Sequence, residues 1–520
     1  MAPISAQSGG EGGGPGESVT RDVDVSAAAR LIGTRAVRGA GALLMRQVVV
    51  KGTTIVGTIV LARILSPADF GVYAVVLFGI TLLTLMGDGG LAASLIQSPE
   101  EPGPGDFGVL FAFQEMVYVP LAISGILLAP GIAAALHLGA GAIGLIRLMS
   151  VSFVIASFRT MATSRLERHL QFDKLAIVEV VEVLVFQGGA ILLAVSGLGV
   201  YSLGLALVAS QIASAALVNV LSPWPIGLRW DRTILARHLS FGVNYQGFVI
   251  VDALKNGAVP LGVGLIAGAT AVGYIVWATG VANYALIFMT ILGRLYFPAF
   301  SRLQADRPAL YRAFERALRV NCLVVYGPSV ALLLYAREIT ETVFTSKWMP
   351  ATDLFPYFVA ISLLLAIVVP CISLLNAIGR PRVVFLFGVG WLLLAWILTV
   401  PLVTGMGFVG FGVANLLMNA LDVILFIVVS RLTGLNLARV VAPYLAAALV
   451  SGGSMFVLRE AIAAAETPGL AFPAMALGIL VYLGILSVIE RDQMRWVIRA
   501  TSRGLYGRRR PPADPGSTSL

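Results

Sequence analysis

Charged residues, cysteines, lysines and histidines are all scarce in this sequence, and each shortage excludes a class of protein. Of the 520 residues, 12% are charged, which is about half of the share found in soluble globular proteins. Since 58% of the residues are hydrophobic, too few polar groups remain to cover a surface in water, and a water-soluble fold is excluded. The two cysteines, Cys322 and Cys371, lie in apolar stretches, so neither a disulfide framework nor a cysteine-based metal site is indicated.

The scarcity of lysine and histidine argues against nucleotide and metal chemistry. None of the four lysines follows a glycine, so the Gly-Lys pair of a Walker A phosphate loop is absent. The three histidines, His137, His169 and His238, are widely separated, which argues against a metal site. The apolar stretches also leave no room for a soluble domain. We therefore expect no catalytic residues, no cofactor and no metal, and the sequence does not indicate an enzyme.

Long apolar stretches are what the sequence has in abundance. They recur at lengths of about 20 residues, which a helix needs to cross a bilayer, and they are continuously apolar, whereas the strands of a membrane β-barrel alternate. The sequence therefore predicts an all-α polytopic membrane protein with about 14 transmembrane helices. Dividing the stretches at glycine, proline and charged clusters places the helices at residues 43–65, 71–97, 107–130, 140–158, 175–196, 199–221, 242–267, 270–293, 319–343, 353–377, 383–404, 407–430, 441–462 and 470–489.

The predicted helices form two pseudo-symmetric bundles of six and an additional pair. Two turns about 200 residues apart suggest the symmetry, because 65–73 and 266–274 both carry Gly and Tyr at the start of the following helix. Six arginines lie among aromatic residues over 294–319, which is typical of an amphipathic helix on anionic lipid, although such arginines can also simply set orientation. The predicted divisions are a disordered cytoplasmic tail at 1–42, an N-terminal bundle at 43–221, a C-terminal bundle with the amphipathic cytoplasmic linker at 222–430, the additional pair at 431–490 and a basic cytoplasmic tail at 491–520.

The distribution of basic residues predicts which side of the membrane each loop faces. The formal net charge is +9; in a soluble protein this would suggest nucleic acid, but in a membrane protein it reports topology, and we expect no nucleic-acid partner. With the N-terminus inside, all but seven of the 36 Lys and Arg residues fall on the inner side. Four of the seven lie outside, and three, Lys51, Arg147 and Lys255, lie within helices. We therefore expect a multi-pass protein of the cytoplasmic (inner) membrane with both termini in the cytoplasm.

Two neighbouring blocks of sequence resemble a known family. They are residues 62–74, ARILSPADFGVYA, and residues 87–97, GDGGLAASLIQ. Both are similar to the signature region of the polysaccharide transporter family, whose members are lipid-linked oligosaccharide flippases within the multidrug/oligosaccharidyl-lipid/polysaccharide exporter superfamily. Shorter similarities at 270–278, 297–303 and 375–381 extend the resemblance over residues 40–435.

The resemblance implies a function as well as a fold. It implies two bundles around a cavity that opens alternately to either side of the membrane, and it implies a lipid-linked (undecaprenyl-diphosphate) oligosaccharide as the substrate, flipped for polysaccharide biosynthesis and export. We expect coupling to an H+ or Na+ gradient or to the membrane potential. The further partners that we expect are anionic membrane lipids, a polysaccharide polymerase and glycosyltransferases.

Two other functions stay open at this point. A multidrug or small-molecule antiporter of the same superfamily would favour an acidic, cation-binding cavity. A membrane-embedded, polyprenyl-dependent glycan enzyme would ordinarily need a substantial outer loop with catalytic carboxylates. The longest predicted outer loop runs only from about residue 336 to residue 353, and its acids are more simply a solvated face.

Basic and amide side chains within helices are the candidates for binding an anionic head group, because charge inside a membrane is costly. Lys51 shares a helix face with Gln47 and is the first choice as the cation for a diphosphate, although it could instead pair with an acid or extend toward the cytoplasm. Arg147 is a further cationic candidate, for which two positions stay open: in the cavity or at the membrane interface. The remaining cavity candidates are Lys255, Asn256, Asn415 and Asn419. Asparagine equally suits hydrogen bonds between helices.

Acidic side chains within helices are the candidates for ion coupling or charge pairing, since a buried carboxyl group can bind a proton. Asp252 and Lys255 lie three residues apart and can pair, or Asp252 can tune a Lys255 that faces Lys51. Glu179 and Glu182 share a helix face, where repulsion could keep one protonated, but the first turns of a helix also favour acids. The other candidates are Asp88, Glu115 and Asp422.

Overall fold

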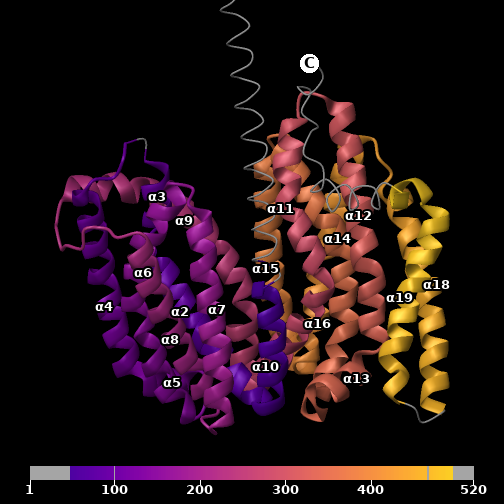
Figure 1. Ribbon diagram of the computed structural model, residues 1–520, viewed down its shortest axis with the longest axis horizontal. Helices are drawn as coiled ribbons and strands as arrows, with labels where there is room; N and C mark the ends of the chain where they lie inside the picture. Colours follow the sequence, from indigo (N-terminus) through magenta and orange to yellow (C-terminus); the bar gives the residue numbers. More distant parts are fainter. Residues whose placement is uncertain (1–46, 48, 99, 465–467, 496–520) are drawn as a thin grey trace, which may run out of the picture.

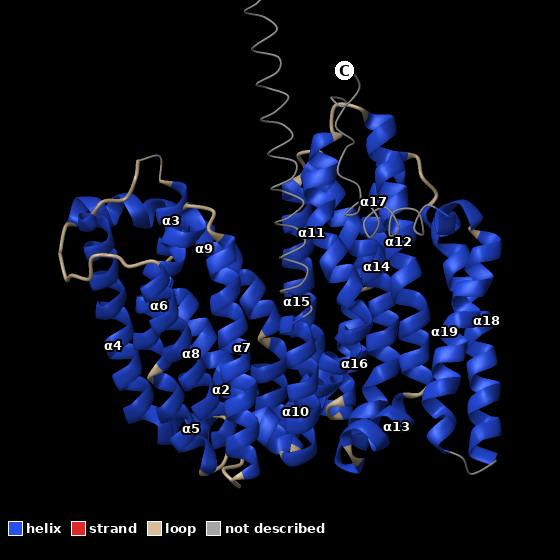
Figure 2. Ribbon diagram, in the orientation of Figure 1, coloured by secondary structure: helices blue, strands red, loops and turns tan. Residues whose placement is uncertain are grey.

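The computed structural model describes residues 47, 49–98, 100–464 and 468–495. These residues form helices joined by short links, without a strand among them (Figures 1 and 2). Twelve helical stretches of the described chain are long and apolar enough to cross a membrane. The predicted all-α polytopic fold is therefore confirmed.

The predicted number of 14 crossings is not confirmed. The first expected helix, at 43–65, begins outside the described residues, although 49–64 is helical. The expected helices at 242–267 and 270–293 fall within one helical stretch, Val249–Arg302, of 54 residues, which is long enough for two crossings of about 20 residues each. Gly268, with φ of 79°, interrupts its helical backbone. The predicted tail at 1–42 lies outside the described residues, as does the basic tail beyond residue 495.

The first half of the chain contains eight helical segments, and local sequence signals explain where they begin and end. Ser66 caps α2, because its hydroxyl accepts from the Asp69 N–H at 3.2 Å and its own N–H donates to the Asp69 carboxylate at 2.9 Å. Gly89 and Gly90, with φ of 55° and 74°, separate α2 from α3. The segments are a helix at 49–64, α2 (Pro67–Asp88), α3 (Leu91–Gln97), α4 (Pro104–Ala135), α5 (Gly141–Ser150), α6 (Ser152–Arg168), α7 (Phe172–Val195) and α8 (Tyr201–Leu221).

The second half contains longer helices and a short-helix segment between α12 and α14. Asp231 and Asp306 begin α9 and α12, because each side chain accepts backbone N–H groups of the first turn. The elements are α9 (Arg232–Asn256), η1 (Ala258–Val263), α10 (Gly264–Ala282), η2 (Asn283–Leu286), α11 (Ile287–Arg302), α12 (Arg307–Leu334), α13 (Ala336–Ile339), η3 (Thr340–Phe344), η4 (Ser346–Leu354), α14 (Phe355–Ala377), α15 (Pro381–Met406), α16 (Val409–Met418) and α17 (Leu421–Thr433).

The basic segment 294–319, which the sequence predicts as a surface helix, is not a separate element. It is divided between the last turns of α11 and the first turns of α12, and only residues 303–306 lie between the two helices. Asp306 starts the new helix directly after the turn. The arginines therefore lie at the ends of long helices, which project together at the top of Figure 1.

The additional pair, α18 (Leu437–Ala464) and α19 (Ala471–Ile489), packs against the second half beside α12 (Figure 1). Ion pairs attach it near both ends: Arg319 of α12 lies 2.6 Å from the Glu490 carboxylate, and Arg459 of α18 lies 2.5 Å from that of Glu338. Between them, Tyr482 fills the space beside Gly327, where a larger residue would overlap its ring. The pair is thus held by buried packing as well as by charge.

Helix α9 contacts both halves of the molecule. Near its start, His238 lies 2.9 Å from the Ser94 hydroxyl of α3, and Gln246 donates to the Leu85 carbonyl of α2. Near its end, the Leu254 carbonyl accepts from the indole of Trp396 in α15 at 3.0 Å. A rotation of one half against the other must therefore break some of these bonds or bend α9.

The two halves cross at α2 and α10 with their backbones in contact. A side chain on Gly71 would overlap the Ala269 carbonyl, and a side chain on Gly273 would overlap the Pro67 carbonyl. The contact is reciprocal, because 71 and 273 are separated by the same 202 residues as 67 and 269. The pseudo-symmetry predicted from the repeated turns is therefore present. Its register differs by one residue from the alignment of the two tyrosines, because Tyr73 and Tyr274 are 201 residues apart.

Candidate functional site

Hydrogen bonds close the gap between the halves at the end of the molecule that the sequence predicts to face outward. The indole Nε1 of Trp348 donates to the Ala62 carbonyl at 2.8 Å, and Nζ of Lys347 donates to the Arg63 carbonyl at 2.9 Å. The Arg63 guanidinium in turn donates to the Val343 carbonyl at 3.0 Å. These bonds tie the first helix to the segment η3–η4 of the second half. Because they use backbone carbonyls, they depend on the position of the two segments rather than on particular side-chain acceptors.

An aromatic cluster fills the space behind these bonds. Trp348 is fully buried and stacks on Trp277 of α10 with ring centroids 5.0 Å apart, while Phe70 of α2 contacts it edge-on at 5.3 Å. Rings from both halves thus pack on one tryptophan. Sequence analysis missed this role of Trp348; a large aromatic residue in a short outer loop is the signal that could have found it. We call the set the outer seal: Ala62, Arg63, Phe70, Trp277, Lys347 and Trp348.

Lys51 lies next to an apolar groove. It is exposed, and no residue in the described ranges pairs with it. Ile55 and Ile59 follow on the same helix face and line a cavity of about 290 Å³. We call this cavity the apolar groove; its other lining residues come from α10, η2, α12, α13, η3 and α19 and are Val281, Tyr284, Ala285, Pro328, Ala331, Leu332, Ile339, Val343, Phe344, Met475 and Ile479.

Three of the predicted cavity residues come together in the second half. Lys255, Asn256 and Asn415 line a cavity of about 180 Å³, which we call the polar cavity. Thr279 and Thr399 add hydroxyl groups to its wall. Sequence analysis missed these threonines, because single threonines in apolar helices form no pattern. The side chain of Asp252 is outside the described part of the structure, so its pairing with Lys255 stays a prediction.

Arg147 and Gln47 have different surroundings. Arg147 is exposed on α5, its Nε donates to the Ile126 carbonyl of α4 at 3.2 Å, and it lines neither the apolar groove nor the polar cavity. Gln47 is half-buried at the start of the described part of the first helix. The structure therefore places Lys51 and Gln47 on one helix and Arg147 elsewhere, in a contact within the first bundle.

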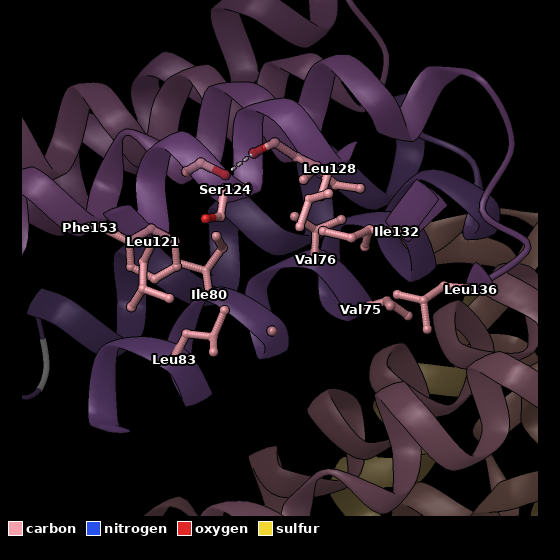
Figure 3. Close-up of a pocket in the computed structure, with 14 residues that line it drawn as sticks. Val75, Val76, Ile80, Leu83, Leu121, Ser124, Leu128, Ile132, Leu136 and Phe153 are labelled. Atoms are coloured by element: carbon pink, nitrogen blue, oxygen red, sulfur yellow. Dashed lines mark hydrogen bonds between the residues drawn. The ribbon is translucent and has the colours of Figure 1, made fainter. Parts of the chain in front are cut away.

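A further cavity lies between α2, α4, α5 and α6 of the first half (Figure 3). It has a volume of about 300 Å³. Figure 3 shows Ile80, Leu121 and Phe153 around it. The hydroxyl of Ser150, one of two serines in the wall, already donates to the Ile146 carbonyl at 2.7 Å. With no charged residue in its wall, this cavity does not suit an anionic head group.

Two acids in the first half that were candidates for coupling have hydrogen-bond donors. Asp88 accepts from Nε2 of Gln114 at 2.9 Å and from the backbone N–H groups that follow the break after α2. Glu115 accepts from the Ser157 hydroxyl. Both carboxylates therefore take part in hydrogen bonds within the first bundle.

The two acids on α7 have different surroundings. Glu182 lies 2.7 Å from the guanidinium of Arg159, so its charge is balanced by a neighbouring helix. Glu179 is half-buried one turn earlier. The ion pair links α6 to α7, and a role of Glu179 and Glu182 in ion coupling stays a prediction.

The polar stripe on α16 and α17 leads from the polar cavity into the protein. Asn419 donates from Nδ2 to the Asn415 carbonyl at 2.7 Å and lies 3.2 Å from its side-chain oxygen. Asp422 is fully buried; its Oδ1 accepts from the Trp391 indole at 3.2 Å, and its Oδ2 has no donor in the described chain. Asn415 therefore lines the cavity, while Asp422 lies within the packed second half.

Two crossed halves, a seal at one end, and polar and apolar cavities behind it define a multi-pass membrane protein with a transporter fold. The solved structure of the lipid II flippase MurJ in an inward closed conformation has the same fold, with a TM-score of 0.69 over 87% of this chain and 98% of that one at 14% identity. The chain belongs to the family described as Polysaccharide biosynthesis protein, which residues 60–353 match.

Two relatives from bacteria agree with this family. The lipopolysaccharide biosynthesis protein WzxC of Escherichia coli (strain K12) is 25% identical over 68% of this chain and 72% of its own length. The succinoglycan biosynthesis transport protein ExoT of Rhizobium meliloti (strain 1021) is also 25% identical, over 63% of this chain and 66% of its own length. The predicted resemblance to polysaccharide transporters is thus confirmed.

Proposed function

We propose that this protein flips a lipid-linked oligosaccharide, of the undecaprenyl-diphosphate type, from the inner to the outer leaflet of the cytoplasmic membrane by alternating access. The family and the names of WzxC and ExoT, which refer to lipopolysaccharide and succinoglycan biosynthesis, support a polysaccharide precursor as the substrate. The observation that carries the proposal is the position of Lys51 beside the apolar groove.

The face of the first helix matches the order of groups in such a lipid. At 1.5 Å of rise per residue, Ile55 and Ile59 lie about 6 Å and about 12 Å beyond Lys51 along the helix. A cation is thus followed directly by a hydrocarbon surface, as a diphosphate is followed by its polyprenyl chain. Lys51 would attract the diphosphate, and the groove would remove the first part of the chain from water and from polar side chains.

The polar cavity supplies side chains that would bind the oligosaccharide part of the head group. Lys255 offers a second cation, and Asn256, Asn415, Thr279 and Thr399 offer amide and hydroxyl groups, which suit the hydroxyl groups of a sugar. These residues do not form the acid-lined cavity that a cation antiporter would favour. Gln47, Arg147 and Asn419 stay predictions as substrate contacts.

The closed outer seal indicates which conformation of the transport cycle this structure represents. If the termini are cytoplasmic, as the basic residues predict, the closed end faces outward, and this arrangement would receive substrate from the inner leaflet. Release would need the outer seal to open, driven by an H+ or Na+ gradient or by the membrane potential. Anionic lipids, the polymerase and the glycosyltransferases remain the partners that we expect.

Depletion of the protein tests this function directly. In cells without it, lipid-linked oligosaccharide should accumulate on the cytoplasmic leaflet, and the wild-type gene should restore export. Lys51→Ala should reduce export about 10- to 150-fold at normal protein levels, because a hydrogen bond to a charged group contributes about 1.5 to 3 kcal/mol. Lys51→Arg should retain most of the activity because it keeps the charge.

A lysine far from the groove provides the control. Lys174 of α7 donates to the Leu221 carbonyl at 3.2 Å, and Lys174→Ala should leave export unchanged. Full export by a double variant, Lys51→Ala with Lys255→Ala, would refute the role of the cations. Normal leaflet distribution of the oligosaccharide in depleted cells would refute the function itself.

A further inference from the structure

We propose that Asp422 is the proton-binding site through which transport is coupled to a proton gradient. The link to transport rests on the proposed function, whereas proton binding is argued from the packing of α14 to α17. Several acids lie within helices, but Asp422 differs from them in its position, its burial and its missing partner.

Asp422 lies at a break in a membrane-spanning helix. The stretch Val409–Thr433 is long and apolar enough to cross the membrane, but α16 ends at Met418 and α17 begins at Leu421. Across the break, the Asp422 N–H donates to the Asn419 carbonyl three residues back, at 3.0 Å, instead of four residues back. Broken helices near the middle of a membrane are where transporters place coupling ions, because helix ends expose polar backbone.

The surroundings of Asp422 do not support a negative charge. The side chain has no exposed surface, and one of its oxygens has no hydrogen-bond donor among the described residues. The nearby buried residues on its own helix, Leu425 and Val429, are apolar. An unpaired carboxylate in such a place carries a large desolvation cost, which protonation removes.

No cation from the neighbouring helices compensates for that charge in the described structure. The helices that pack most closely against α17 are α14 and α15. α14 contains no charged residue and presents the thiol of Cys371, and α15 presents the Trp391 indole. Arg382, the one charged residue of α15, is nine positions from Trp391, or about 14 Å along the helix. Arg431 of α17 is equally far from Asp422 along its own helix.

Two hydrogen bonds connect the Asp422 backbone to the wall of the polar cavity. Asn419 lies one turn before Asp422 and bonds to Asn415, which lines the cavity together with Lys255. Loss of the proton would create a negative charge near the site proposed for an anionic head group, where the start of α17 would partly stabilise it. Proton binding and substrate binding would then favour each other, since coupling between two sites is reciprocal.

Asp88 and Glu182 lack this combination. Asp88 has three donors, and Glu182 has the guanidinium of Arg159. A sodium ion would need several oxygen ligands, whereas the group that points at Asp422 is the N–H of Trp391. A proton therefore fits the site better than a metal cation does.

Infrared spectroscopy of the purified full-length protein in lipid nanodiscs tests proton binding without any substrate. The wild-type protein at neutral pH should show the C=O stretching band of a protonated carboxylic acid, and Asp422→Asn should lack that component. Asp88→Asn is the matched control and should retain it. Trp391→Phe should keep the band but shift it to higher frequency, because the indole donor is lost; this variant also tests the assignment if Asp422→Asn folds poorly.

The outcomes separate this proposal from the proposed function. An Asp422→Asn spectrum identical to the wild type would overturn the assignment, and so would loss of the band when KCl is replaced by NaCl at constant pH, which would assign the site to sodium. Neither result bears on whether depletion of the protein traps oligosaccharide on the inner leaflet. Conversely, a depletion experiment without effect would leave the spectrum, and hence the proton site, unchanged.

Discussion

A single methyl group at the crossing of α2 and α10 should open the outer seal. Gly71→Ala places a Cβ against the Ala269 carbonyl, which is backbone and cannot rotate away. Overpacking of this kind costs about 1 to 3 kcal/mol, and the cost is present only while the two helices cross. Since about 1.4 kcal/mol corresponds to a tenfold change in an equilibrium, the population with an open outer side should rise about 5- to 150-fold.

Labelling of a cysteine in the wall of the apolar groove, directly beside the outer seal, measures that population. Val343→Cys keeps the backbone carbonyl that Arg63 uses, and the native Cys322 and Cys371 are fully buried. In intact cells, a membrane-impermeant maleimide should react with this cysteine about 5- to 150-fold faster when Gly71→Ala is present, as long as labelling follows the open population.

Glycines in the same helices serve as controls. Gly79 of α2 and Gly280 of α10 have open space where a Cβ would lie, so Gly79→Ala and Gly280→Ala gain the same helix propensity, about 1 kcal/mol, without the overlap. Gly273→Ala should act as Gly71→Ala does, because the contact is reciprocal. Equal labelling rates for Gly71→Ala and Gly79→Ala would refute the reasoning.

Two further substitutions test the contacts that hold the halves and the additional pair. Trp348→Phe keeps an aromatic ring but loses the bond to the Ala62 carbonyl and part of a fully buried side chain. The rate of maleimide labelling should therefore rise at least about fivefold, because the hydrogen bond alone corresponds to about 1 kcal/mol and the cavity adds to that cost; no change would mean that Trp348 does not hold the seal closed. Arg319→Met leaves Glu490 without its cation and should lower the free energy of unfolding by about 3 kcal/mol, seen as a lower melting temperature in detergent, whereas Arg312→Met, on an exposed position of the same helix, should not. A melting temperature unchanged by Arg319→Met would contradict the anchoring role.

The predicted all-α membrane fold was confirmed, although the number of 14 crossings was not, because hydropathy is a local property. A run of apolar residues in lipid must form a helix wherever it sits in the fold, since its backbone has no water to bond. The helix starts were predicted less well: helices expected from 71 and from 319 begin at Pro67 and Arg307, where Ser66 and Asp306 cap them through contacts within one turn. The segment 294–319 was predicted less well, because a basic and aromatic pattern suits both a surface helix and the ends of two crossing helices.

The candidate site was only partly predictable. In one continuous helix, the spacing of Asn415, Asn419 and Asp422 would put them on one face, yet the break after Met418 leaves Asn415 at a cavity and Asp422 buried beside Trp391. In the same way, no pattern in the sequence pairs Glu182 with Arg159. Contacts between helices depend on which faces meet, and the spacing of residues along one helix does not contain that information.

The sequence by itself thus determined the environment of the protein, its helices and the short set of charges worth testing, because the cost of charge and of unpaired backbone in lipid applies residue by residue. Only the tertiary structure decided what those charges do. It placed Lys51 beside an apolar groove and Lys255 with Asn415 at a cavity. It also used Trp348 to close the gap between the halves at one end, because a seal and a binding site are made by segments that are distant in the chain and meet only when the two halves pack.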